Sequence, residues 1–211
     1  MRVLFLGNSF TYFHDLPVMA ARLTGWDTDS VTRGGAYLHQ FLDPKDELNA
    51  RMEAALEKGP WDYVVLQEQS FNAVGNPEDF LKSVKGLCEK IRALGAAPVL
   101  YCSWAYKEGG PFLQEAGLSY QQMMEGLLAS YTRAAQENQA LIAPVGPAFA
   151  QLQKDYPLYD PDTLHPSLYG SFLAACVICQ TISPKVSFSS WIPEGMEQAA
   201  ADTFQRKAKE D

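Results

Sequence analysis

The chain has 211 residues, which is enough for one domain with a full-sized hydrophobic core. Its apolar fraction of 47% and charged fraction of 20% are ordinary for a globular protein. The net charge of −8 excludes nucleic acid and anionic membrane surfaces as favoured partners, because both repel an acidic surface. No apolar stretch reaches the roughly 18–20 residues that a membrane-spanning helix needs.

The first element is the short apolar run Arg2–Leu6, which leads directly into Gly7-Asn8-Ser9. A signal peptide would need a longer apolar core and a cleavage site of small residues. We therefore interpret the run as the first strand of the mature fold. We expect a cytoplasmic protein, unless a leader peptide has been removed.

Further short apolar runs follow, each near the length of a buried parallel strand. They are Asp27–Thr32, which is the weakest, Tyr63–Leu66, Pro98–Cys102 and Ala140–Ala143. Helical patterns separate them or follow them, at Leu16–Leu23, Asp46–Lys58, Pro77–Leu94, Ser119–Asn138, Pro147–Asp155, after Ser167, and at Pro193–Lys207. Strands that alternate with helices predict an α/β fold, a three-layer α/β/α sandwich around a five-stranded parallel sheet.

Polar and small residues follow the predicted strands, where ligands bind in sheets of this kind. They are Gly7-Asn8-Ser9, Arg33-Gly34-Gly35, Gln67-Glu68-Gln69-Ser70, Ser103-Trp104 and, after a further helix, residues 160–166 with the sequence DPDTLHP. We expect these segments to meet at the carboxyl edge of the sheet and to form the functional site.

Ser9 is the candidate nucleophile, but a serine hydroxyl needs a base to remove its proton. Of the three histidines, His165 is the best candidate because Asp162 precedes it by three residues. On a tight turn this spacing lets the carboxylate bind the imidazole Nδ1–H, which leaves Nε2 free to face the serine. We interpret His14 as a local hydrogen-bonding residue.

Acyl transfer also needs hydrogen-bond donors for an oxyanion. The backbone N–H groups of Ser9 and Gly35 are candidates, and the side-chain amide of Gln69 or Gln67 can supply a third donor. We place Asn8 and Trp104 among the substrate-binding residues as well. Trp104, Tyr106 and Phe112 follow the fourth strand and could stack against a sugar ring or an acyl chain; core packing is the alternative for them.

Four blocks, GNSFT, the Gly-Gly pair after the second strand, VVLQEQS and DTLHPS, together resemble the SGNH or GDSL-type hydrolases. Their order matches, and the resemblance covers about residues 1–180. It implies a flavodoxin-like fold and hydrolysis of lipid, carbohydrate or small acyl esters. By position it makes Ser9 the nucleophile, Asp162 and His165 its partners, and Gly35 the oxyanion glycine.

The chain departs from the pattern of these hydrolases in two blocks. Asn8 stands where an aspartate is common, and Gln69 is in register with an asparagine that donates to the oxyanion. Gln67 is the second choice for that donor. Glu68, between the two glutamines, could orient Gln69 or His165 or pair with Arg33.

These residues predict a serine esterase that hydrolyses short-chain acyl esters through an acyl-serine intermediate. O-acetyl groups on carbohydrates are one candidate substrate. The alternative is a non-catalytic ligand-binding domain on the same fold. A nucleotide or phosphate binder is disfavoured, because the first turn lacks a G-x-G-x-x-G or G-K-[ST] motif.

The sequence predicts no cofactor and no metal site. Cys176 and Cys179 form a C-x-x-C, but their apolar flanks favour buried helix cysteines over a metal or redox pair. We expect an SGNH-hydrolase-like domain over residues 1–182. Residues 183–211 would form a C-terminal helical extension packed on that domain, with a charged tail, Gln205–Asp211, that frays. The oligomeric state is not predicted.

Overall fold

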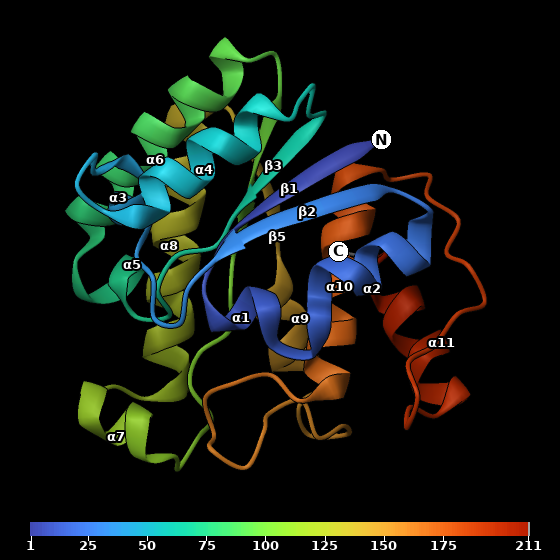
Figure 1. The fold of residues 1–211 in the computed structure, drawn as a ribbon. Helices are drawn as coiled ribbons and strands as arrows, with labels where there is room; N and C mark the ends of the chain where they lie inside the picture. Colours follow the sequence, from blue (N-terminus) through green and yellow to red (C-terminus); the bar gives the residue numbers. More distant parts are fainter. Residues whose placement is uncertain (211) are drawn as a thin grey trace.

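A computed structural model describes residues 1–210 as a five-stranded sheet with helices on both faces (Figure 1). The strands are β1 (Arg2–Gly7), β2 (Asp27–Thr32), β3 (Tyr63–Leu66), β4 (Ala97–Tyr101) and β5 (Leu141–Ala143). They lie in the order β2-β1-β3-β4-β5, and every neighbouring pair is parallel. This is the flavodoxin-like order, so the predicted fold class is confirmed.

The position of each strand in the sheet explains its composition. β1, β3 and β4 lie between other strands and are almost completely buried, which accounts for their continuous apolar runs. β2 forms one edge, and only Val31 among its residues is buried. After β1 the chain continues to β2 on one side, and after β3 it continues to β4 on the other side, so the strand order reverses between β1 and β3. In sheets of this kind, ligands bind beyond the carboxyl ends of the two strands at such a point.

Two groups of helices cover the two faces of the sheet (Figure 1). One face carries α3 (Leu38–Leu42), α4 (Glu47–Glu57), α5 (Asn72–Gly75), α6 (Pro77–Ala93) and α8 (Tyr120–Asn138). The other carries α2 (Leu16–Thr24), α9 (Val145–Leu152), α10 (Leu168–Ile182) and α11 (Gln198–Lys207). Each group encloses its own apolar core against the sheet. This arrangement gives the three layers that the alternating pattern predicts.

Short helices lie near the carboxyl edge of the sheet, where the sequence offers no periodic signal. Besides α3 and α5, they include α1 (Ser9–Tyr12), the 3₁₀ turn Phe13–Asp15 and α7 (Pro111–Ala116). Such helices are too short to show an amphipathic repeat, and tertiary contacts hold them in place. They matter because α1 begins with Ser9 and because α7 borders a pocket described below.

The C-terminal segment packs against the second group of helices. α11 contacts α10, and Phe204 of α11 is fully buried in the apolar core on this face of the sheet. α11 begins at Gln198 instead of the predicted Pro193, because a turn with Gly195 at φ 85° precedes it. The predicted extension and its tail end at Asp211, which lies outside the described residues. Within residues 1–210, no helix combines the length and apolar character needed to cross a membrane.

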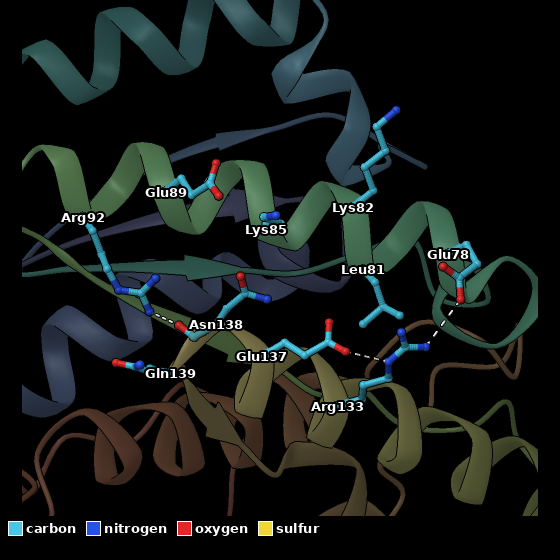
Figure 2. A pocket seen from close by; sticks show the side chains of 10 residues that line it. All are labelled: Glu78, Leu81, Lys82, Lys85, Glu89, Arg92, Arg133, Glu137, Asn138 and Gln139. Carbon is cyan, nitrogen blue, oxygen red and sulfur yellow. Dashed lines mark hydrogen bonds and ion pairs between the residues drawn. The ribbon is translucent and has the colours of Figure 1, made fainter.

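A groove of about 570 Å³ runs between α6 and α8, and charged side chains of both signs line it (Figure 2). Arg133 pairs with Glu137 at 2.8 Å and approaches Glu78 at 3.4 Å. Arg92 donates a hydrogen bond to the backbone carbonyl of Asn138. We call this feature the charged groove.

Candidate active site

Ser9 lies at the first position of α1, directly beyond the end of β1. Asn8 caps this helix: its side-chain oxygen accepts a hydrogen bond from the Phe10 N–H at 3.1 Å. The Asn8 amide group also donates to the backbone carbonyls of Ala36, at 3.0 Å, and Glu68, at 3.3 Å. Asn8 therefore ties the end of β1 to the segments that follow β2 and β3, and this fixes the position of Ser9.

His165 and Asp162 lie together on a loop that α10 follows. Asp162 Oδ2 is 2.5 Å from His165 Nδ1, and Asp162 Oδ1 accepts from the backbone N–H groups of Leu164 and His165. Burial pushes the pKa of Asp162 upward, but the hydrogen bonds to His165 and to the two backbone donors outweigh it, so the pKa lies below its usual value. The carboxylate is thus held ionised beside the imidazole.

The structure brings Ser9, His165 and Asp162 into one hydrogen-bonded chain, although Ser9 and His165 are 156 residues apart. His165 Nε2 lies 2.8 Å from Ser9 Oγ. With the proton on Nδ1 held by Asp162, Nε2 can accept the serine proton. The ring of Phe13 stacks on the imidazole with centroids 4.2 Å apart and an interplanar angle of 7°. Phe13 therefore holds the plane of the imidazole.

A pocket of about 180 Å³ opens onto this chain, and we call it the reaction pocket. It is lined by Asn8, Ser9, Phe10, Gly35, Gln69, Ser70, Leu164 and His165. Gly35 adopts φ 67°, a conformation that residues with a side chain rarely take, in the turn after β2. Ser9, with 8% of its surface exposed, is reachable from this pocket and otherwise buried. A small reacting group can therefore contact Ser9, Gly35, Gln69 and His165 together.

Neither a protein-family model nor a curated protein matches the sequence. Solved structures do. A candidate SGNH hydrolase from Slackia heliotrinireducens is 38% identical to this chain, with a TM-score of 0.83 over 87% of this chain and 99% of its own. The chain belongs to the SGNH hydrolases.

Two further solved structures share the fold of this SGNH hydrolase at lower identity. A DUF4886 family protein from Bacteroides uniformis is 19% identical, with a TM-score of 0.79 over 100% of this chain and 93% of its own. The acetylxylan esterase Axe2 from Geobacillus stearothermophilus is 15% identical, with a TM-score of 0.64 over 86% of this chain and 94% of its own.

The two candidate glutamines occupy different places in this SGNH hydrolase. Gln69 lines the reaction pocket, and its carbonyl oxygen accepts from the N–H groups of Phe71, at 2.8 Å, and Asn72, at 3.0 Å. These bonds fix the orientation of the amide, whose NH₂ group contacts Ser70 Oγ at 3.3 Å. The NH₂ group keeps capacity for a second acceptor, because it carries two donors.

Gln67 does not line the reaction pocket, and its proposed role as the alternative donor does not fit its position. Its Oε1 accepts from the Asn8 N–H at 2.8 Å and from Thr11 Oγ1 at 2.9 Å, and its Nε2 donates to the Glu68 carbonyl. The side chain is buried against Gly7, where a Cβ atom would lie 2.7 Å from Oε1. Gln67 joins β1 to β3 beneath the pocket.

For Trp104 the structure favours core packing, the alternative that the sequence left open, over substrate binding, because the side chain is completely buried. Its ring stacks between Phe10, with centroids 4.5 Å apart, and Phe149, with centroids 4.0 Å apart. Its indole N–H donates to the Leu164 carbonyl at 3.2 Å. Trp104 thus supports the walls of the reaction pocket from below, through Phe10 and through the residue that precedes His165.

Glu68 is buried under the same turns and does not pair with Arg33 or contact His165. Its Oε1 accepts from the N–H groups of Leu38, at 3.0 Å, and Gln69, at 2.6 Å. Its Oε2 has no hydrogen-bond partner within the described residues. Burial raises the pKa of this carboxyl above its usual value. Glu68 therefore joins the segments after β2 and β3.

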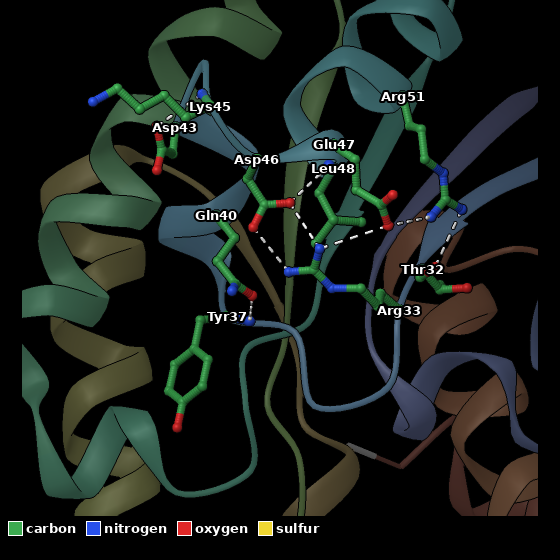
Figure 3. Close-up of polar contacts among 10 residues, drawn as sticks. All are labelled: Thr32, Arg33, Tyr37, Gln40, Asp43, Lys45, Asp46, Glu47, Leu48 and Arg51. Atoms are coloured by element: carbon green, nitrogen blue, oxygen red, sulfur yellow. Dashed lines mark hydrogen bonds and ion pairs between the residues drawn. The ribbon is translucent and has the colours of Figure 1, made fainter.

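Arg33 instead anchors the segment that carries Gly35 (Figure 3). Its guanidinium binds both oxygens of Asp46, at 2.8 and 2.9 Å. Asp46 in turn accepts from the Leu48 N–H at 2.9 Å and caps α4. The guanidinium holds the pKa of the Asp46 carboxyl below its usual value. This pair fixes the turn after β2 to the start of a long helix.

The remaining candidates lie away from the reaction pocket. His14 has a left-handed backbone, at φ 53°, and its Nε2 lies 4.0 Å from Asp160. Cys176 and Cys179 are fully buried in α10, and burial raises the pKa of both thiols. Residues 1–210 contain no group of three or more His, Cys, Asp and Glu side chains arranged to hold a metal ion.

Proposed function

We propose that this SGNH hydrolase is a serine esterase that cleaves carboxylic esters through an acyl-serine intermediate. The observation that carries the proposal is the distance of 2.8 Å between Ser9 Oγ and His165 Nε2, in a chain that continues to Asp162. A base within hydrogen-bond reach, itself oriented by a carboxylate, is what an activated serine requires.

In the proposed reaction, Ser9 Oγ attacks the ester carbonyl carbon while His165 Nε2 takes the hydroxyl proton. The negative charge on the carbonyl oxygen is stabilised by the N–H groups of Ser9 and Gly35 and by the Gln69 amide. His165 then returns the proton to the alcohol oxygen, and the alcohol leaves. Water, deprotonated by the same imidazole, attacks the acyl-serine and releases the acid and Ser9.

The size of the reaction pocket, a structural neighbour and the net charge each narrow the class of ester that we propose as substrate. A reaction pocket of about 180 Å³ suits a small acyl group, and esters as small as acetates are the simplest candidates. Axe2 is named as an acetylxylan esterase, which supports O-acetylated carbohydrates as one class to examine. The acidic charge of −8 disfavours strongly anionic substrates.

The proposal is tested with p-nitrophenyl acetate and a fluorophosphonate probe. We expect Ser9→Ala and His165→Ala each to lower kcat by roughly 10³-fold or more, because nucleophile and base act as a unit. The probe should label Ser9 in the wild type and in Ser190→Ala, a matched change at an exposed serine. Full activity in Ser9→Ala would overturn Ser9 as the nucleophile. A wild type with neither ester hydrolysis nor labelling at Ser9 would favour the non-catalytic binding domain instead.

A further inference from the structure

A second pocket, of about 340 Å³, adjoins the reaction pocket, and we call it the aromatic pocket. Its lining includes Tyr37, Gln69, Phe71, Tyr106, Phe112 and Glu115. These residues come from the start of α3, the turn after β3, the segment after β4 and α7. The Tyr106 ring lies 6.4 Å from that of Phe71 and 5.8 Å from that of Phe112. Four aromatic side chains from distant segments thus surround one cavity.

The two pockets share a wall. Gln69 lines both, and Ser70, which lines the reaction pocket, is hydrogen-bonded at 2.9 Å to the hydroxyl of Tyr106, which lines the aromatic pocket. His165 lines only the reaction pocket. A substrate held at Ser9 can therefore extend into the aromatic pocket past Gln69, on a side that His165 does not border.

This arrangement decides which part of an ester faces the aromatic pocket. The leaving alcohol oxygen must lie against His165 Nε2, since that nitrogen returns the proton. The carbonyl oxygen must face the oxyanion donors, which include Gln69. The remaining substituent of the carbonyl carbon is the acyl chain. The aromatic pocket borders Gln69 but not His165, so it lies away from the leaving alcohol. We therefore assign it to the acyl chain.

The lining indicates the chemistry of the chain. Aromatic side chains bind other aromatic rings favourably, in offset or edge-to-face contacts with centroids about 4.5–7 Å apart. The Tyr106 hydroxyl is already bonded to Ser70, and the lining contains no cationic residue. Glu115 contributes a carboxylate, which disfavours an acyl chain that ends in a negative charge.

We propose, on the basis of the esterase function above, that the aromatic pocket is the acyl subsite and that the preferred acyl group carries a neutral aromatic ring. This goes beyond the short acyl chain expected from the sequence, which the reaction pocket alone would accommodate. Acetate then fills only the reaction pocket, whereas a phenylpropanoyl group also fills the aromatic pocket.

The test keeps the alcohol constant and varies the acyl group. We expect the wild type to have a higher kcat/KM for p-nitrophenyl 3-phenylpropanoate than for p-nitrophenyl acetate. Phe112→Ala should lower the ratio of the two values by roughly tenfold, the size of one lost aromatic contact. Phe112 is 37% exposed, so its removal should not unfold the protein; Leu128→Ala, at 38% exposed on α8, is the matched control and should keep the ratio.

Other outcomes overturn the inference. An unchanged ratio in Phe112→Ala, or a wild type that prefers acetate, would remove the acyl subsite. A parallel assay keeps the acetyl group and varies the alcohol. A loss of activity in Phe112→Ala that is confined to acetylated xylo-oligosaccharides would assign the aromatic pocket to the alcohol and would also overturn the inference. In each of these cases Ser9-dependent hydrolysis of p-nitrophenyl acetate would leave the esterase function standing. If no ester is hydrolysed in a Ser9-dependent manner, the proposed function itself fails.

Discussion

The charged groove and the reaction pocket are two polar cavities with opposite internal organisation. The charged groove is larger, about 570 Å³ against about 180 Å³, and carries far more charge. Its Arg133 already binds Glu137 and Glu78 on the protein surface (Figure 2). In the reaction pocket, by contrast, the hydrogen-bonded chain that begins at Asp162 and continues through His165 ends at Ser9, which lines the cavity.

Solvent explains why this difference matters for chemistry. The Arg133 and Glu137 side chains are 54% and 50% exposed, so water screens their attraction. Ser9 is only 8% exposed, and a charge that develops beside it would interact strongly with the nearby donors. A cavity with many charged side chains is therefore a weaker sign of catalysis than a small cavity at the end of the hydrogen-bonded chain from Asp162 through His165 to Ser9.

The strongest test of the comparison removes the negative charge of Asp162 while keeping the shape of its side chain. Asp162→Asn should lower kcat for p-nitrophenyl acetate by roughly 10³- to 10⁴-fold, because the amide no longer favours the proton on His165 Nδ1. Asp160→Asn, on the same loop, is the control and should retain most activity. Retention of activity in Asp162→Asn would mean that the hydrogen bond from His165 to Asp162 is not needed for the reaction.

The second test concerns the buried wall of the reaction pocket. Trp104→Ala should lower the free energy of unfolding in urea by about 3–5 kcal/mol, because it opens a cavity between the Phe10 and Phe149 rings. Trp191→Ala, at a partly exposed position, should cost less. A loss of activity without loss of stability in Trp104→Ala would instead support substrate contact at Trp104.

The third test uses the buried carboxyl beneath the pocket. Burial raises the pKa of Glu68 above its ordinary value of 4.5, so its contribution to stability is fully present below that pH and is lost as pH rises through the folded-state pKa. We expect the Tm of the wild type, relative to that of Glu68→Gln, to fall as pH rises above 4.5. A difference that is independent of pH, or that grows with pH, would contradict this assignment.

The smallest effect is expected in the charged groove. Arg133→Gln should leave ester hydrolysis unchanged and lower Tm slightly at low ionic strength, because its ion pairs are exposed. The decrease should shrink in high salt as the ion pairs are screened. A clear loss of ester hydrolysis in this variant would mean that the charged groove takes part in function and that the comparison with the reaction pocket is wrong.

Much of the fold could be predicted because its signals are local. The apolar run Arg2–Leu6 predicts the first strand from adjacent residues alone, and β1 spans Arg2–Gly7. The spacing of Asp162 and His165 likewise predicts their contact on one turn, and they lie 2.5 Å apart. The catalytic roles of these residues stay predictions until the variants are measured.

Residues whose orientation depends on distant partners could not be predicted in the same way. Gln67 and Gln69 are alike in sequence, but Gly7 leaves room for the Gln67 side chain beneath the pocket. Trp104 follows a strand and could have faced either the pocket or the core. The rings of Phe10 and Phe149 enclose it in the core. α7 was missed because its six residues are too few for a periodic signal.

The sequence by itself determined the alternation of strands and helices, the fold class and the residue types at the strand ends. Apolar period, caps and turns express these features within a few neighbouring residues. Only the tertiary structure decided that Gln69 lines the reaction pocket while Gln67 does not, that Trp104 is core, and that four aromatic rings surround a second pocket. Such features depend on side chains from segments far apart in the chain, whose relative positions are set by the packing of the whole sheet and its helices.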